Sequence, residues 1–212
     1  MDKKVLRSDL ELFPTLISVY SGILTDEQCS LIKDYCHKKK SSQHPTLYGE
    51  GKSSHSYYSN ILHDISNELP QCSNLYQEIG DIMNDYSKTF GNNSVVIKNS
   101  WFNFQQKGSV LAQHVHSLSV VSAAIYINTD DESSKLYFNN PNQIISQVYM
   151  YEETGTKYLN DYFYIKPEKG YVIVFPSWIY HGSLNTENKT KDRLVISANA
   201  VRKYWHWKII LV

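Results

Sequence analysis

The stretch "KPEKGYVIVFPSWIYHGS", residues 166–183, combines an apolar strand with a histidine that follows it. A turn at Glu168 to Gly170 precedes the apolar run Tyr171 to Phe175, and Pro176 ends that run. A short apolar run between turn residues is typical of a strand that is buried in a sheet. A buried strand that ends in Pro-Ser-Trp and is soon followed by a histidine, His181, would be unusual if these residues served packing alone. We therefore expect a functional histidine at the end of a buried strand.

Strands of the same kind fill the chain from Val95 onward. Short runs rich in Val, Ile, Tyr and Phe repeat with a period of two, as in "VVIKNSWFNFQ", "SVVSAAIYINT", "SKLYFNN", "DYFYIKP" and "RLVISANAVRKYW". Such strands after two helices predict an α+β fold that is mainly β, and their number and spacing suit a double-sheet jelly roll. We expect one domain over residues 1–212, with helical support over about 1–92 and a strand core over about 93–205.

Two helices are predicted before these strands. "LTDEQCSLIKDYCHKKK" opens with Thr25 and then Gln28, a capping-box pattern that is followed by apolar residues at helical spacing. "CSNLYQEIGDIMNDYSKTFG" repeats apolar residues at the same spacing and stops at Gly91, the expected left-handed C-cap. The polar, turn-rich stretch of residues 38–60 is expected to be a loop.

The composition argues against several classes of partner. Lys plus Arg equals Asp plus Glu at 21 each, so no basic surface favours a nucleic acid or an anionic membrane. The first residues lack the apolar segment of a signal peptide, and no apolar run is long enough for a transmembrane helix, so we expect a cytoplasmic protein. The three cysteines, Cys29, Cys36 and Cys72, are expected to be buried reduced thiols.

Two histidines in "AQHVHSLS", residues 112–119, are candidate metal ligands. His114 and His116 are one residue apart in a stretch that otherwise resembles a strand, so both imidazoles would point to one face and could bind one ion. Taken alone, such a pair is more often a loop or surface feature. Five further histidines have polar or aromatic neighbours and are expected at the surface, namely His37, His44, His55, His63 and His206.

Arg193 opens the apolar strand "RLVISANA", with Val195, Ser197 and Asn199 on the same face of that strand. An arginine that points into the interior of a sheet is costly unless it meets an anion. A carboxylate ligand is therefore its natural partner.

Four segments together resemble a known family: "SWFNFQQKGSVLAQHVHSLSVVSAAIYIN", "SKLYFNNP", "GYVIVFPSWIYHGS" and "RLVISANA". They look like the iron(II)- and 2-oxoglutarate-dependent oxygenases of marine bacteria and their phages. The pattern of that family runs approximately W-x-N, H-x-H-P, S-G-x-Y-Y, L-x-F-x-D-P, F-P-S-W-x-x-H and R-x-S-x-S-x-N. The resemblance covers about residues 100–200 and implies a cupin-like double-stranded β-helix that uses Fe(II) and 2-oxoglutarate. If a phage encodes the protein, its place is the host cytoplasm.

The resemblance also implies the residues of a site. They are His114, His116 and His181 as iron ligands, Arg193 as the partner of the distal carboxylate of 2-oxoglutarate, Ser197 or Tyr126 beside that carboxylate, and Asn103 and Asn199 along the cavity. The chain departs from the pattern at two of the positions that matter. The wider superfamily usually has Asp or Glu where His116 stands, and Val195 replaces the serine of the Arg-x-Ser pattern.

Three functions remain open at this point. The first is a dioxygenase that hydroxylates an amino-acid, peptidyl or other small substrate and releases succinate and CO2. The second is a cupin-like three-histidine dioxygenase without 2-oxoglutarate, and the third is a non-catalytic jelly-roll binding module. A homodimer is only the generic expectation. Candidate pocket residues are aromatic, namely Trp101, Phe104, Tyr126, Tyr137, Phe138, Trp178 and Tyr180.

Overall fold

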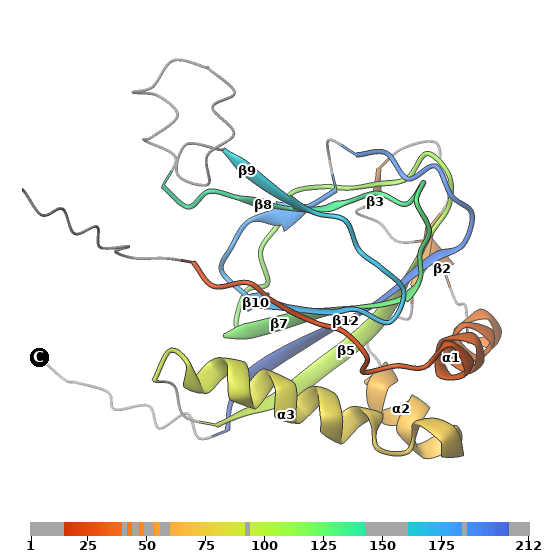
Figure 1. Cartoon of the computed structure of the whole chain (residues 1–212), viewed down its shortest axis with the longest axis horizontal. Helices are drawn as coiled ribbons and strands as arrows, with labels where there is room; N and C mark the ends of the chain where they lie inside the picture. Colours follow the sequence, from red (N-terminus) through yellow and green to blue (C-terminus); the bar gives the residue numbers. More distant parts are fainter. Residues whose placement is uncertain are drawn as a thin grey trace, which may run out of the picture.

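Three layers make up the structure, a computed structural model that describes residues 15–39, 42–43, 47–48, 53–55, 60–91, 94–142, 161–183 and 186–203. Helices cover one face of a large sheet, and a small sheet lies over the opposite face (Figure 1). The arrangement confirms the predicted α+β fold, mainly β, with a double-stranded β-helix core and N-terminal helices.

Antiparallel pairing joins the neighbouring strands in every sheet of the described chain. The major sheet has the order β1 (Ser18–Tyr20), β10 (Val172–Pro176), β7 (Val121–Asn128), β12 (Arg193–Arg202), β5 (Val95–Gln105), β4 (Ser53–His55) and β2 (Ser42–Gln43). The minor sheet has the order β11 (His181–Gly182), β8 (Leu136–Asn139) and β9 (Tyr162–Ile165). A further pair consists of β3 (Leu47–Tyr48) and β6 (Val110–Leu111).

The helices are α1 (Asp26–Lys38), α2 (Ile61–Glu68), the 3₁₀ helix η1 (Pro70–Cys72) and α3 (Leu75–Lys88). Both bonds of the predicted capping box are present at the start of α1, between Thr25 and Gln28. Gly91 follows the end of α3 with a φ of 67°, a left-handed conformation that suits glycine. The short helix α2, of eight residues, was not predicted from the sequence.

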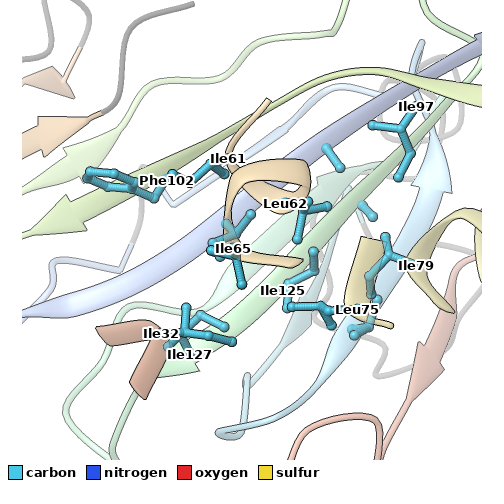
Figure 2. Close-up of a cluster of buried hydrophobic side chains, with 14 of the residues drawn as sticks. Ile32, Ile61, Leu62, Ile65, Leu75, Ile79, Ile97, Phe102, Ile125 and Ile127 are labelled. Atoms are coloured by element: carbon cyan, nitrogen blue, oxygen red, sulfur yellow. The ribbon is translucent and has the colours of Figure 1, made fainter. Parts of the chain in front are cut away.

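Two apolar clusters lie on the two faces of the major sheet. Alternate residues of β7 and β12, such as Ile125 and Ile196, face the helices and join the larger cluster, part of which is drawn in Figure 2. The residues between them, such as Tyr126 and Val195, face the minor sheet and join Phe138 in the smaller cluster. The period of two therefore separates a helix-facing core from the space between the sheets.

Three expectations need correction. The stretch of residues 38–60 is not only loop, because β2, β3 and β4 lie within it and two of them extend the major sheet. The first 92 residues are likewise not purely helical support, since β1 pairs with β10. The stretch around His114 is not a regular strand, because His114 forms only an isolated bridge with His181.

Several further expectations concern cysteines, histidines and membrane spans. Cys29, Cys36 and Cys72 are free and buried. His63 is exposed, whereas half-buried His37 packs against the Phe104 ring at 4.2 Å between ring centres. His44, His206 and the side chain of His55 lie outside the described residues. Among the described helices, none is long and apolar enough to cross a membrane.

Replacing Ile79 with alanine should destabilise the protein by about 2–5 kcal/mol, because this fully buried α3 side chain packs in the larger cluster and its truncation leaves a cavity. The matched control is Val96→Ala on β5, whose side chain is exposed. Urea denaturation of both variants measures the difference. Equal midpoints for the two variants would contradict the packing described above.

Candidate metal centre

Three histidines from two distant parts of the chain meet at one point. His114 and His181 form a two-way backbone bridge, with N to O distances of 3.0 and 3.1 Å. The amide of His116 donates to the carbonyl of Ser177 at 2.9 Å. This bond holds the segment of His114 and His116 against the residue that follows β10. One ligand atom from each of the three imidazoles lies within 4.8 Å of the others. The predicted histidines are therefore brought together.

Hydrogen bonds determine which nitrogen of each ring is free. The Nδ1 atoms of His114 and His181 lie 2.9 Å from the carbonyl oxygens of Ala112 and Ile179, respectively. A carbonyl only accepts, so each Nδ1 carries the proton and each Nε2 keeps its lone pair. The Nε2 atoms of His114 and His116 lie 3.2 Å apart. Two lone pairs at that distance repel each other unless a cation lies between them.

A chain of side chains orients His116. Its Nδ1 lies 2.7 Å from the Ser122 hydroxyl, which in turn donates to Asn199 Oδ1 at 2.8 Å. Because the Ser122 proton goes to Asn199, the Ser122 oxygen accepts from His116 Nδ1. The hydroxyl of Ser177 lies 2.8 Å from the same oxygen. His116 thus has the same free Nε2 as the other two histidines, and protein oxygens hold all three rings.

Burial keeps the three imidazoles uncharged. It lowers the pKa of His116 to about 4, with a smaller contribution from the neighbouring charge of His114. It also lowers the pKa of His114 and, more strongly, that of His181. Neutral imidazole is the form that binds metals, so no proton has to be displaced near neutral pH.

Aromatic rings enclose part of the histidine cluster. The ring centre of Trp101 lies 5.6 Å from that of His116, and Phe175 lies 4.6 Å from His181. Phe138 lies 5.1 Å from Phe175, so it also faces the space between the sheets. Trp101 and Phe138 were predicted to line the site, whereas Phe175 was not.

Four other aromatic residues that were predicted to line the site do not lie beside the histidines. Phe104 faces the helices, because it belongs to the helix-facing cluster. Tyr137 packs against Tyr162 and Tyr164 of β9. Trp178 and Tyr180 are 57% and 50% exposed, since buried Ile179 and His181 take the alternate positions.

Arg193 lies at the other end of the same sheet face. It is 4% exposed and pairs in register with Gln105 of β5, whose side-chain oxygen accepts from the guanidinium. A second guanidinium nitrogen donates to the Ser134 carbonyl at 3.3 Å, and the Tyr126 ring centre lies 5.3 Å from the guanidinium carbon. Burial lowers the pKa of Arg193. The guanidinium is thus enclosed by neutral groups.

No carboxylate of the described chain pairs with Arg193. Its Nε is buried without a hydrogen-bond partner, and so are the Ser134 hydroxyl and the side-chain oxygen of Asn103. Unpartnered buried polar atoms and an unpaired buried charge are both costly. The two that can donate, Arg193 Nε and the Ser134 hydroxyl, fit an anionic ligand, whereas the Asn103 oxygen needs a donor.

The remaining predicted residues divide between the two ends. Tyr126 and Asn103 lie beside Val195 in register, next to Arg193. Asn199 lies at the histidine end, where it accepts from Ser122. Ser197 lies between them, half-buried, with Trp101 and Ala124 as its neighbours on the adjacent strands.

Several residues of the site were not identified from the sequence. Gln105 and Ser122 could have been found, since they continue the inward-facing positions of β5 and β7 by a period of two. Ser134 and Asn188 lie in connections between strands, where no periodicity marks them. Buried Asn188 bonds to the backbone of both Gln105 and Ser134.

The donor set fits a ferrous ion. Two ligand nitrogens that each lie about 2.1 Å from one ion on the same side of it are about 3 Å apart, close to the 3.2 Å between His114 Nε2 and His116 Nε2. The three ligand atoms lie within 4.8 Å of one another. Such a face leaves coordination positions open, as in non-haem iron oxygenases. The group of potential ligands contains no carboxylate, which distinguishes it from the usual two-histidine, one-carboxylate arrangement.

Comparison with known proteins finds one matching family. The model of a family described as "Putative 2OG-Fe(II) oxygenase" matches residues 99–199, which confirms the resemblance drawn from the sequence motifs. The cofactor and cosubstrate of that family are Fe(II) and 2-oxoglutarate, as expected. A search of curated proteins finds no match.

Solved structures share the fold at low sequence identity. They include a Pseudomonas putida prolyl-4-hydroxylase, at 12% identity over 90% of this chain and 94% of that chain, with a TM-score of 0.50. HygX from Streptomyces hygroscopicus, with nickel and 2-oxoglutarate bound, matches at 11% over 90% and 84%, with a TM-score of 0.56. The α-ketoglutarate-dependent epimerase SnoN from nogalamycin biosynthesis matches at 11% over 89% and 79%, with a TM-score of 0.58.

Replacing Ser122 with alanine should weaken Fe(II) binding by about 10-fold to 100-fold, because His116 Nδ1 loses the oxygen that orients its ring. Anaerobic competition with a chromophoric chelator measures the affinity. Ser177→Ala is the comparison, since the Ser177 hydroxyl touches Ser122 but not the His116 ring, and its effect should be smaller. Unchanged Fe(II) affinity in Ser122→Ala would show that the ring is held by packing alone.

The metal-free protein should lose stability as the pH falls below 6.5, the ordinary pKa of these histidines. Below that pH the unfolded chain binds protons that the folded chain does not, so the free energy of unfolding falls until the folded-state pKa is reached, about 4 for His116. Urea denaturation at about pH 7.5 and about pH 5.5 measures the loss. The loss should be smaller in His116→Gln, and an equal loss in both proteins would contradict this origin.

Proposed function

We propose that the protein is an Fe(II)- and 2-oxoglutarate-dependent dioxygenase, because the model of a family described as "Putative 2OG-Fe(II) oxygenase" matches residues 99–199. The reaction we propose is hydroxylation of an amino-acid, peptidyl or other small substrate, with release of succinate and CO2. The observation that carries the proposal is the meeting of three free Nε2 atoms at one end of a sheet face that has an unpaired arginine at its other end.

The metal ligands in this proposal are His114, His116 and His181. Their tautomers support it, since hydrogen bonds occupy each Nδ1 and leave Nε2 toward the shared point. Their charge supports it as well. Three neutral imidazoles leave the double charge of a ferrous ion uncompensated, which favours binding of an anionic chelate over binding of water.

The cosubstrate residues in this proposal are Arg193, Tyr126 and Asn103, with Ser197 between them and the metal. Arg193 would pair with the distal carboxylate, which would give the buried guanidinium an anionic partner and its Nε an acceptor. Asn199 is given a positioning role in this proposal, because it accepts from Ser122, which in turn contacts His116. It would act on the metal ligand and not on the cosubstrate.

When bound, iron and 2-oxoglutarate supply the oxidising chemistry that activates dioxygen. The chain itself would bind and orient the cosubstrate and the substrate, and would exclude water from them. Trp101, Phe138 and Phe175 provide an apolar wall beside the histidines, and Arg193 determines which end of a dicarboxylate lies away from the metal. Side chains that act as a general acid or base are not part of this proposal.

The substrate class in this proposal is broad. The similar structures include one named a prolyl-4-hydroxylase and one named an epimerase from nogalamycin biosynthesis, so the fold serves more than one outcome. We retain an amino-acid, peptidyl or other small molecule as the class. We also retain one domain over the chain, because β1, β2 and β4 of the first third complete the major sheet.

The deciding experiment adds 2-oxoglutarate to anaerobic protein loaded with Fe(II). A weak visible absorption band from the bidentate chelate should appear in the wild-type protein and be absent in His116→Ala. In Arg193→Ala the apparent Kd of 2-oxoglutarate should rise about tenfold or more, because a charge-assisted contact is lost. Ser87→Ala is the control, because Ser87 is buried on α3, outside the space between the major and minor sheets.

The other outcomes separate the alternatives. Tight iron binding without a chelate band would overturn the role of 2-oxoglutarate and favour a cupin-like three-histidine dioxygenase, in which Arg193 holds the carboxylate of the substrate. That alternative has an observation in its favour, since the ligand group consists of histidines only. Failure to bind iron would leave a jelly-roll binding module.

A further inference from the structure

We propose that Ser134 is a cosubstrate-binding residue, whose hydroxyl donates a hydrogen bond to the same distal carboxylate that Arg193 pairs with. The proposal rests on the function proposed above and adds a residue that lies outside the strand carrying Arg193. It explains how the site can hold a carboxylate although Val195 offers no hydroxyl.

The position of Ser134 beside the guanidinium comes from its own backbone. Its carbonyl accepts from a terminal nitrogen of Arg193 at 3.3 Å. A serine hydroxyl lies only a few ångströms from the carbonyl oxygen of the same residue, so the Ser134 hydroxyl lies within about 7 Å of that nitrogen. Ser134 is 1% exposed, which keeps bulk water from that hydroxyl.

The Ser134 hydroxyl has no hydrogen-bond partner within the described chain. A buried hydroxyl without a partner costs free energy, so such atoms in a folded protein call for a ligand or a water molecule. Arg193 Nε, a donor only, is also buried without a partner. Two unpartnered donors beside a positive charge match a carboxylate, which accepts from both and neutralises the charge.

The Arg193 strand itself supplies no hydroxyl at this end. Val195 is the next inward-facing residue, and it packs with Tyr126 in the smaller cluster. Ser197, one step farther along the same face, is paired with Trp101 and so lies toward the histidines. A hydroxyl for the distal carboxylate therefore has to come from another element. The Tyr126 ring of β7 lies beside the guanidinium, and Ser134, in the loop before β8, offers a second hydroxyl.

The loop that carries Ser134 is held firmly. The Ser134 amide donates to Asn188 Oδ1 at 3.4 Å, and the Lys135 amide donates to Thr186 Oγ1 at 2.9 Å. Asn188 also donates to the carbonyl of Gln105 at 3.0 Å, so one buried amide links both neighbours of Arg193. A hydroxyl on such a support is preorganised, which lowers the entropic cost of binding.

The test compares two ligands that differ only at the far end. The affinity of anaerobic, Fe(II)-loaded protein for 2-oxoglutarate and for 2-oxopentanoate, which lacks the distal carboxylate, is measured from the chelate absorption. In Ser134→Ala, the Kd of 2-oxoglutarate should rise about tenfold, while that of 2-oxopentanoate stays within about twofold. Adding Val195→Thr should recover most of the lost affinity by restoring a hydroxyl beside Arg193.

Two further proteins keep the test decisive. Ser87→Ala removes another buried, unpartnered hydroxyl, on α3, and should leave both affinities unchanged. If Ser134→Ala does not fold, Ser134→Cys keeps the shape and replaces a strong donor with a weak one, with the same expected selectivity.

The outcomes distinguish this inference from the function on which it rests. Wild-type protein that forms no chelate with 2-oxoglutarate overturns both. A normal wild-type chelate, with Ser134→Ala binding 2-oxoglutarate within about twofold of wild type, overturns the role of Ser134 and leaves the oxygenase standing. Equal weakening for both ligands assigns Ser134 to the support of the loop and also overturns the inference.

Discussion

The pairing of β12 between β5 and β7 is the constraint on which both ends of the site depend. Ten residues of β12 pair antiparallel with β5, so Arg193 meets Gln105 at one end and Asn199 meets Asn99 toward the other. The pairing with β7 places Asn199 beside Ser122, which supports His116. A shift of one residue in the pairing register of β12 would turn these inward-facing side chains toward the helices, because successive side chains of a strand alternate between faces.

Charge relates the two ends of the site to each other. The histidine end offers three neutral nitrogens to a divalent cation, and the arginine end holds a buried positive charge among neutral groups. Neither end has a protein carboxylate opposite it in the described chain. A dicarboxylate that spans the face would neutralise both ends, so the same chain that lacks the usual acidic metal ligand has a stronger electrostatic reason to bind a dianion.

Much of this arrangement could be predicted because it follows a period of two. The strand predicted at Tyr171 to Phe175 is present, shifted by one residue to Val172–Pro176, and His181 follows it. The shared face of Arg193, Val195 and Asn199 also agrees with the alternation. The rule failed at Trp178 and Tyr180. These residues lie in the turn and bridge beyond β10, where their neighbours Ile179 and His181 are buried instead.

By itself, the sequence determined the class of fold, the two capped helices and the identity of the three histidines, because local periodicity and short motifs depend on residues near one another. Only the tertiary structure decided that Asn199 supports His116, that Ser134 and Gln105 flank Arg193, and that Asn188 joins them. Those contacts join residues from different strands and loops. Their geometry depends on strand register and on buried hydrogen bonds that no local pattern encodes.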